Sequence, residues 1–270
     1  MDTTILLHGL PANKETYTYL LFEAGAQSLE AFRAFYSGHA PVMSSLYIHP
    51  QLETFREYGP WLLEAENQTQ LSGYLGTLPG VVGVIAARRH LSSVAIQLSR
   101  GCTIVGPDNH VSLVRFYAQH VLEVLSSCAE SDWHRFLFRD IEQWWVPGKE
   151  EWEQVIIPVS TASNPPDPIV RLDNKRWPLI VDKIDISSVL TQWQKMPSSL
   201  HFSPCIQRDM VIKALEKAKN AGITNESDSK LYALCYLNGG KRVLESEEMQ
   251  LALLKVSEGK CSLESVLLKR

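Results

Sequence analysis

The sequence predicts an α/β N-terminal lobe, with a mixed sheet flanked by helices, followed by a small all-helical C-terminal lobe. Strand-like and helix-like patterns alternate over residues 1–158, residues 159–170 contain three prolines among Ser, Thr and Asn, and the pattern from Phe202 onward is helical. Alternating strands and helices are typical of a layered domain, whereas clustered prolines interrupt both. We therefore expect an α/β domain over 1–158, a connector over 159–200 and a helical lobe over 201–270.

Eight short runs of apolar or alternating residues in the first region are expected to form strands. In the run PWLLEA, alternation should place Trp61, Leu63 and Ala65 on one side of the strand. Pro-Asp-Asn at 107–109 separates two other runs and predicts a hairpin turn. The expected strands span residues 17–25, 43–48, 60–66, 81–89, 102–106, 110–117, 141–148 and 151–158.

Helices are expected where apolar residues recur at helical spacing between capping residues. Ser28 should cap the first of them, and in the C-terminal region Ser203 should act as an N-cap with Pro204 at the first helical position. The segment 169–197 is ambiguous, with a possible helix over 186–195. The other expected helices span residues 28–38, 50–59, 69–78, 90–101, 118–128, 131–140, 203–222, 228–240, 246–259 and 262–270.

The composition favours a globular protein and argues against several classes of partner. The chain has 26 Lys and Arg against 30 Asp and Glu, mixed along its length, so no basic stripe is present to follow a nucleic acid. Its longest apolar runs, such as 81–87, are shorter than the roughly 18 residues of a membrane span. The N-terminus lacks the basic segment and cleavage site of an export signal. We therefore expect a cytoplasmic protein that is not exported and binds neither nucleic acid nor membrane.

Motifs of catalysis and cofactor binding are absent from the sequence. The five cysteines are scattered and form no CxxC pair, the eight histidines form no HExxH, and no glycine loop has the spacing of a nucleotide site. The segment 5–12, ILLHGLPA, contains a His-Gly turn of the kind used in α/β-hydrolases, but the chain has no GxSxG nucleophile elbow. We therefore predict no catalytic residue, no metal ligand and no cofactor.

Arg115 is the first of two features that remain. It lies in the run SLVRFY, where strand alternation places it on the face of Val111, Leu113 and Tyr117. A charge among apolar neighbours has to be paired or has to reach the sheet edge. We expect a carboxylate partner for Arg115 that locks a strand to a helix, and the alternative is an enzymatic site around Arg115 and Tyr117.

Three tryptophans around Pro147-Gly148 are the second feature. Trp144 and Trp145 are adjacent, so they point to opposite faces of a strand and cannot both be buried unless both faces are covered. We expect one of them to be exposed, and exposed aromatic residues are typical anchors of protein interfaces. Trp144, Trp145 and Trp152 are therefore the predicted partner-binding residues.

Five segments, in the same order and at similar spacing, resemble the cytoplasmic effector adaptors, or chaperones, of bacterial type VI secretion (Tap or Tec proteins). This family was first defined as a domain of unknown function. The resemblance covers roughly residues 17–147. The clearest of these segments is RFYAQHVL from Arg115 to Leu122, where the family has RFYDPRVL. The other segments are YTYLLFEAGA from Tyr17, with Glu23 where an aspartate is usual, Ser45-Leu46-Tyr47, Gly59-Pro60-Trp61-Leu62-Leu63 and His90-Leu91.

The resemblance implies a non-enzymatic protein that binds one toxin effector and delivers it to the secretion spike. Glu23, Gly59, Pro60, Trp61, Arg115, Phe116 and Tyr117 would then be structural residues of the family motif. Ala118-Gln119-His120 replaces the family's Asp-Pro-Arg, which removes the aspartate best placed to cap the next helix or to pair with Arg115. Besides the enzyme, an immunity protein that neutralises one toxin remains an alternative.

Overall fold

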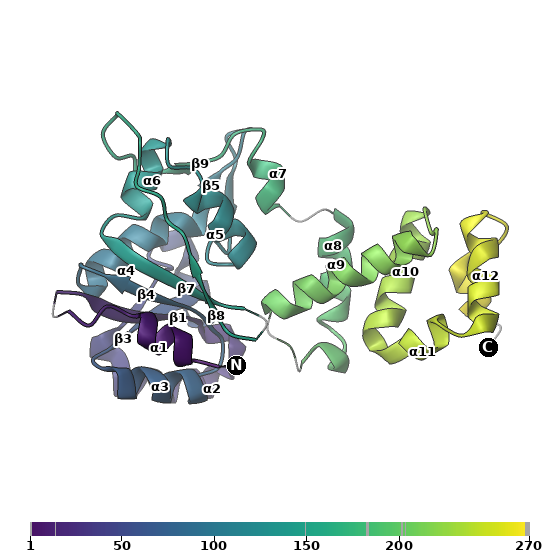
Figure 1. The fold of residues 1–270 in the computed structure, drawn as a ribbon, viewed down its shortest axis with the longest axis horizontal. Helices are drawn as coiled ribbons and strands as arrows, with labels where there is room; N and C mark the ends of the chain where they lie inside the picture. The colour runs from purple at the N-terminus through teal and green to yellow at the C-terminus, as the bar shows by residue number, and fades with distance from the viewer. Residues whose placement is uncertain are drawn as a thin grey trace. The chain divides into compact units, whose positions relative to one another are not determined.

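The chain forms two compact units, Met1–Ile180 (unit 1) and Val181–Arg270 (unit 2) (Figure 1). The structure is a computed structural model that describes residues 2–13, 15–148, 150–181, 184–200, 202 and 204–267. The predicted fold class is confirmed, with sheets in the N-terminal part and helices in the C-terminal part. The segment 159–200, expected as a connector, is divided between the two units.

The main sheet of unit 1 has six strands in the order β2-β3-β1-β4-β7-β8, and all neighbouring strands are antiparallel. Its central strand β1 pairs Leu21 with Leu62 of β3 on one side and with Gly83 of β4 on the other. Every strand lies in a segment that was expected to form one. The strands are β1 Tyr17–Glu23, β2 Met43–Ser45, β3 Pro60–Ala65, β4 Val81–Ala87, β7 Ile141–Pro147 and β8 Trp152–Val155.

Helices cover both faces of this sheet, which gives unit 1 three layers and two cores. On one face, Trp61, Leu63 and Ala65 pack with side chains from α1, α2 and α3, as the alternation predicted. On the other, Leu21 and Leu62 pack with side chains from α4, α5 and α6. These helices are α1 Thr4–Gly9, α2 Leu29–His39, α3 Gln68–Thr77, α4 Leu91–Ser99, α5 Gln119–Ser126 and α6 Asp132–Leu137.

Capping side chains explain where two of these helices begin. Ser28 caps α2 as predicted, because its hydroxyl accepts a hydrogen bond from the Ala31 amide at 3.2 Å. Asn67 caps α3 in the same way through the amide of Gln70, at 2.9 Å. The expected helix over 50–59 is instead a 3₁₀ helix, Pro50–Tyr58.

A small second sheet contains the predicted hairpin. Its three strands, β5 Thr103–Val105, β6 Val111–Leu113 and β9 Val170–Arg171, have the order β6-β5-β9. The pair β5 and β6 is antiparallel, whereas β9 runs parallel to β5, so the mixed pairing expected of the fold is found in this sheet. Strand β9 and the short helix α7 Trp177–Ile180 lie in the segment expected as a connector.

Unit 2 is helical, and the helices expected there are present in the described residues. Two apolar clusters hold it together, one around Trp193 and Val211 and the other around Tyr232 and Leu253. The expected helix over 228–240 is interrupted near its end because Gly239 adopts a φ of 85°. The expected N-cap Ser203 lies outside the described residues. The helices are α8 Ile184–Trp193, α9 Pro204–Asn220, α10 Glu226–Cys235, α11 Lys241–Leu244, α12 Glu247–Ser257 and α13 Leu263–Leu267.

No helix among the described residues is long and apolar enough to span a membrane.

His134 is the one histidine that the described part of unit 1 buries completely. Its Nε2 lies 2.9 Å from the carbonyl oxygen of Ser126, while Nδ1 has no hydrogen-bond partner among the described residues. Burial lowers the pKa of the imidazole, since the charged form would lose its hydration. The folded protein therefore holds His134 neutral.

We predict that the free energy of unfolding falls as the pH drops below about 6.5, the ordinary pKa of histidine. The unfolded chain then takes up a proton that the folded chain resists, so stability is lost with falling pH in this window and is unaffected above it. Each unit by which the pKa is lowered contributes about 1.4 kcal/mol. Urea unfolding between pH 8 and pH 5 should show this slope in the wild type, and His134→Phe should flatten it. His110→Gln, at an exposed position, should keep the slope, and an unchanged slope in His134→Phe would contradict the assignment.

Candidate functional site

The residues of the RFY segment meet the last residue of β1. The guanidinium of Arg115 forms an ion pair with Glu23, and the hydroxyl of Tyr117 donates a hydrogen bond to Glu23 Oε1 at 2.7 Å. The Glu23 side chain is 12% exposed and that of Arg115 is 44% exposed. We call Glu23, Arg115 and Tyr117 the Glu23 cluster. The prediction that Arg115 pairs with a carboxylate is confirmed.

Arg115 reaches Glu23 from a turn and not from a strand. Strand β6 ends at Leu113, and the Ala118 amide donates to the Arg115 carbonyl at 2.9 Å, which closes a turn before α5. The expectation that 110–117 forms one strand is therefore wrong beyond Leu113. The turn directs both Arg115 and Tyr117 to the same carboxylate.

Phe116 and Tyr117 anchor this turn in the core. Phe116 is fully buried, with its ring 6.1 Å from that of Trp144, and a Cβ on Gly101 would lie only 2.7 Å from the Phe116 ring. Burial, together with the negative charge of Glu23, raises the pKa of Tyr117 well above its ordinary value. Tyr117 therefore acts as a neutral hydrogen-bond donor to Glu23.

The Gly-Pro-Trp segment supports the same end of the sheet. Gly59 packs against the ring of Tyr47, where a Cβ would lie 2.4 Å from the ring, so a side chain at position 59 would displace Tyr47. The Gly59 carbonyl accepts from the Ala24 amide at 3.0 Å, and the Pro60 carbonyl accepts from the Leu46 amide at 2.9 Å. These contacts connect the segment after β2 to the residue that follows Glu23.

Trp61 belongs to the opposite face of the sheet. Its indole Nε1 donates to the Arg56 carbonyl at 2.8 Å, and its ring lies 5.3 Å from that of Phe32. Trp61 therefore fixes the 3₁₀ helix against α2 and does not contribute to the Glu23 cluster.

The departure from the family pattern at Ala118-Gln119-His120 has a local consequence. Helix α5 begins after Ala118 with no side-chain hydrogen bond to its first turn. Gln119 instead donates to Glu123 at 3.1 Å and to Glu153 of β8 at 3.3 Å. The lost aspartate is thus not needed for Arg115, whose carboxylate partner is Glu23.

The expectation of an exposed tryptophan is wrong. Trp144 packs in the core beneath α4, α5 and α6, whereas Trp145 and Trp152 pack in the core beneath α1, α2 and α3. Both faces of strand β7 are covered, so adjacent tryptophans point to opposite faces and are both buried. In this structure the three residues predicted to bind a partner are core residues.

Exposed apolar residues gather instead in the segment 48–58, near the residues that follow β1. Ile48, Phe55 and Tyr58 all have large exposed side chains, at 47%, 55% and 58%. The segment is adjacent to the end of β1, because the Tyr58 carbonyl oxygen would lie 2.9 Å from a Cβ on Gly25. Aromatic residues of this kind are enriched at interfaces. The sequence offered a signal for them, since Leu52, Phe55 and Tyr58 recur at every third position in a polar run.

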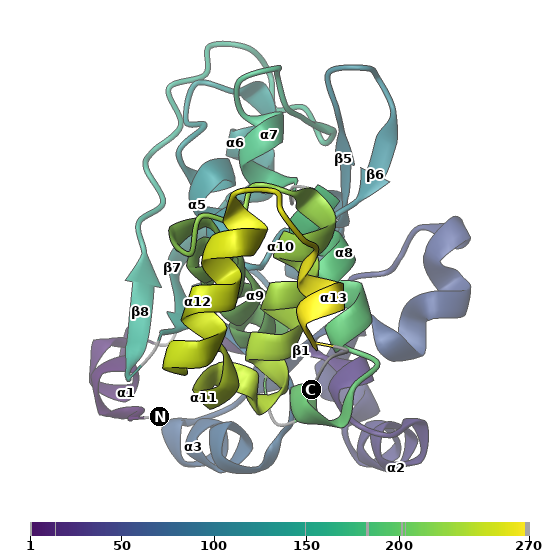
Figure 2. The same ribbon diagram turned by 90° about the vertical axis from the view of Figure 1, so that its right-hand side faces the viewer.

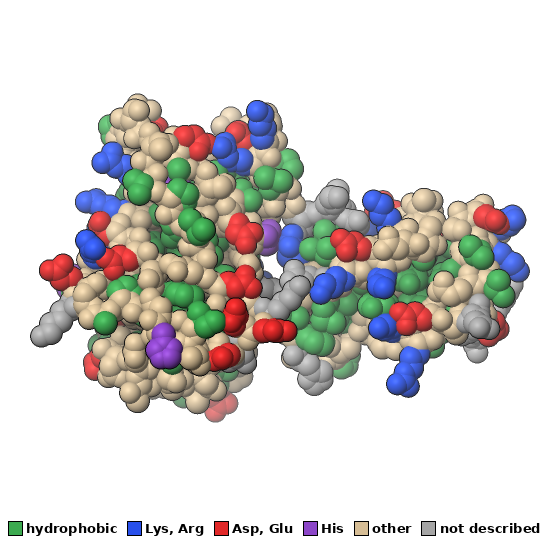
Figure 3. Space-filling view, viewed as in Figure 1, with side chains coloured by type: hydrophobic (Ala, Val, Ile, Leu, Met, Phe, Trp, Pro, Cys, Tyr) green, Lys and Arg blue, Asp and Glu red, His purple; other side chains and the backbone are tan. Residues whose placement is uncertain are grey.

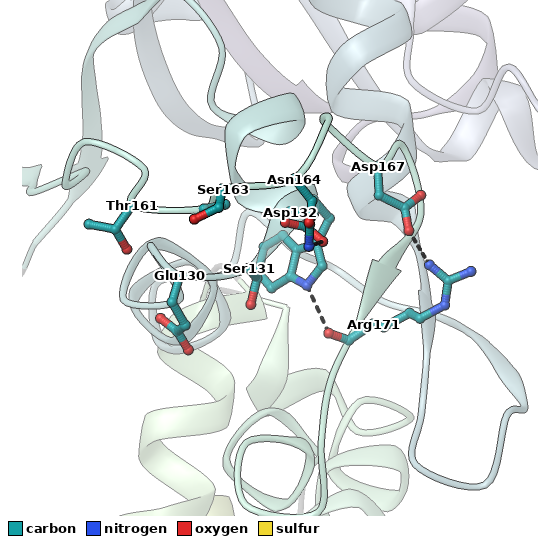
Figure 4. Close-up of a pocket in the computed structure, with 10 residues that line it drawn as sticks. Glu130, Ser131, Asp132, Thr161, Ser163, Asn164, Asp167 and Arg171 are labelled. Atoms are coloured by element: carbon teal, nitrogen blue, oxygen red, sulfur yellow. Dashed lines mark hydrogen bonds and ion pairs between the residues drawn. The ribbon is translucent and has the colours of Figure 1, made fainter.

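A polar pocket of about 560 Å³ lies where α6 begins (Figure 4). Five of the polar side chains that line it are paired with one another or with near neighbours. Asn164 Nδ2 donates to Asp132 Oδ2 at 3.0 Å, and Arg171 forms an ion pair with Asp167. Glu130 pairs with Arg176. The contact between Asn164 and Asp132, with that between Trp133 Nε1 and the Arg171 carbonyl at 2.9 Å, holds residues 161–171 against α6 and favours a structural role for the pocket.

The described residues include no metal-binding group, and their buried cysteines are neutral thiols. No group of three or more His, Cys, Asp or Glu side chains in that part of the chain could hold a metal ion. Four cysteines described there, Cys102, Cys128, Cys235 and Cys261, are free thiols. Burial raises the pKa of Cys102 and of Cys128, so both are held as neutral thiols.

We predict that Glu23→Gln lowers the free energy of unfolding by about 1–3 kcal/mol, because hydrogen bonds to a charged group are stronger than neutral ones. Glu57→Gln is the matched control, since Glu57 forms a bidentate pair with Arg33 in which both side chains are exposed. That control should cost less than Glu23→Gln, because solvent screens an exposed pair. Urea unfolding measures both values. Equal losses in the two variants would show that the Glu23 cluster adds nothing beyond a surface ion pair.

Comparison with known proteins gives one match. Neither the curated proteins nor the solved structures contain a match to this chain. Residues 18–135 match the model of DUF4123, a domain of unknown function. The matched range lies within unit 1 and includes the Glu23 cluster and the Gly-Pro-Trp segment. The contacts that close the end of β1 are therefore contacts within a DUF4123-like segment.

Proposed function

We propose that this protein is a non-catalytic cytoplasmic adaptor that binds a type VI secretion toxin effector and loads it onto the secretion spike. The observation that carries the proposal is the Glu23 cluster. Arg115 and Tyr117, the residues on which an enzymatic alternative depends, both bind Glu23 inside the fold. The DUF4123 match over residues 18–135 falls within the range that resembles the adaptor family, which supports the same reading.

An adaptor of this kind needs two surfaces, one for each partner. In unit 1, the segment 48–58 presents three exposed apolar residues on a support fixed by Trp61. In unit 2, Leu251 and Leu254 are exposed one turn apart on α12. Figure 3 shows further hydrophobic side chains on the drawn face of unit 2, with Lys and Arg side chains beside them. An interface of about 800 Å² per partner is sufficient for a specific complex.

Delivery also requires that the adaptor leave its cargo before the spike is fired. We therefore expect an affinity that competition from the spike can overcome, and not a permanent complex. The polar run around Phe55 and Tyr58 agrees with this expectation, because interfaces of permanent complexes are more hydrophobic.

We predict that the tagged protein co-purifies with the toxin encoded beside its gene and, separately, with the spike protein. Replacing Phe55 and Tyr58 by Ser should reduce the recovery of one partner by about tenfold or more, because exposed aromatic residues are frequent hot spots. Ile156→Ser with Val159→Ser is the matched control. Those two residues are 82% and 89% exposed and lie after β8, away from the segment 48–58 in the sequence.

The outcomes separate the three candidate functions. Recovery of neither partner would refute the adaptor. Recovery of the toxin alone, with protection of cells that carry only this gene, would identify an immunity protein. Arg115→Ala distinguishes the enzyme, since a structural arginine lowers the melting temperature when removed, whereas a catalytic one would abolish turnover with the fold intact.

A further inference from the structure

The hydrogen bonds of the β5–β6 hairpin determine which backbone groups of β6 face outward. The Val114 amide donates to the Cys102 carbonyl, and the Gly106 amide donates to the His110 carbonyl, both at 2.9 Å. Hydrogen-bonded and non-bonded pairs alternate along an antiparallel ladder. In this register Ile104 and Ser112 form the bonded pair between these two. The N–H and C=O groups of residues 111 and 113 therefore point away from β5.

The outward backbone groups of β5 form hydrogen bonds beside β9, whereas those of β6 face no strand of the described chain. The Val105 carbonyl accepts from the Leu172 amide at 3.0 Å, beside β9. Strand β6 is the other edge of the sheet, and no strand of the described chain pairs with its outer side. In Figure 2 the hairpin projects from unit 1 with β6 on its outer side. Two N–H and two C=O groups are thus available at this edge, on Val111 and Leu113.

The side chains at this edge are also open to a partner. Val111 is 67% exposed and Leu113 is 53% exposed, on the solvent face of the sheet, while Ile104 and Val170 fill the inner face. Proteins commonly protect an edge strand with Lys, Pro or a bulge. The run His110-Val111-Ser112-Leu113-Val114 contains neither residue, and the register of β6 is regular. This edge is therefore suited to pair with another strand.

We propose that β6 pairs antiparallel with β6 of a second copy of this chain, about a two-fold axis at Ser112. Val111 of one copy then lies opposite the partner's Leu113, and the four outward groups of each copy form four hydrogen bonds between the copies. The two three-stranded sheets become one sheet of six strands.

The charges at the two ends of β6 select this arrangement. The turn before β6 carries the exposed Asp108, and β6 is followed by Arg115, whose side chain remains 44% exposed while it is paired with Glu23. Antiparallel pairing brings the Asp108 end of one copy beside the Arg115 end of the other. Parallel pairing would place like charges together. A second copy is therefore complementary in hydrogen bonds, in apolar side chains and in charge.

The test is the oligomeric state of the full chain over a concentration series, by sedimentation equilibrium. The wild type should show a monomer–dimer equilibrium. Val111→Pro and Leu113→Pro each remove an outward N–H that the hairpin does not use, so the dissociation constant should rise about tenfold or more. Val111→Thr keeps both the N–H and the shape of the side chain, and it should still dimerise. Circular dichroism checks that each variant is folded. If a proline variant does not fold, Val111→Lys takes its place, because a lysine on an edge strand also opposes pairing.

A disulfide tests the register directly. Residues 112 of the two copies would form a non-bonded pair, with Cα atoms about 4.5 Å apart, which a disulfide can bridge. Ser112→Cys should give a covalent dimer on mild oxidation, and neither the wild type nor Ser112→Cys with Val111→Pro should do so. A wild type that remains monomeric, a dimer that survives both proline variants, or an effector segment that occupies the edge in place of the second copy would overturn the proposal.

Discussion

A nearly buried carboxylate at the end of the central strand β1 fixes where the turn between β6 and α5 packs against the main sheet. Glu23 is 12% exposed, and a charge in that position is costly unless other groups compensate it. Arg115 and Tyr117 supply a cation and a hydroxyl donor from the turn that joins β6 to α5. Through this contact the main sheet, the small hairpin and α5 share one anchor. The Gly-Pro-Trp segment meets the same end of β1 through the contact between Gly59 and Ala24.

Local patterns were sufficient to predict most of the fold, because strands and helices carry their own periodicity. The alternation after Gly59 placed Trp61 and Leu63 on one face, and Ser28 marked the start of α2. The pairing of Arg115 with a carboxylate was predictable on energetic grounds, since a charge among apolar residues needs a partner. The identity of that partner was not predictable, because Glu23 is 92 residues away, at the end of β1 in the main sheet.

What the sequence could not show depends on contacts between distant segments. Strand β9 has two residues and exists only because β5 lies beside it, so its own pattern is that of a proline-rich connector. The burial of Trp144 and Trp145 depends on helices covering both faces of the sheet, and neither residue's neighbours in sequence reveal that. The end of β6 at Leu113 also depends on a distant contact, since the turn after it places Arg115 against Glu23.

The covering of both sheet faces also limits how unit 1 can bind a protein. Side chains on those faces are buried in the two cores, so a protein partner can contact only loops, strand edges and the outer sides of helices. Unit 1 has large exposed apolar residues at such places. Phe55 and Tyr58 lie in a 3₁₀ segment, and Val111 and Leu113 lie on an edge strand. Because the segment 48–58 and the turn after β6 both contact the end of β1, the Glu23 cluster stabilises the supports of both surfaces. A buried polar contact can therefore affect partner binding without touching a partner, by fixing the positions of the loops that do.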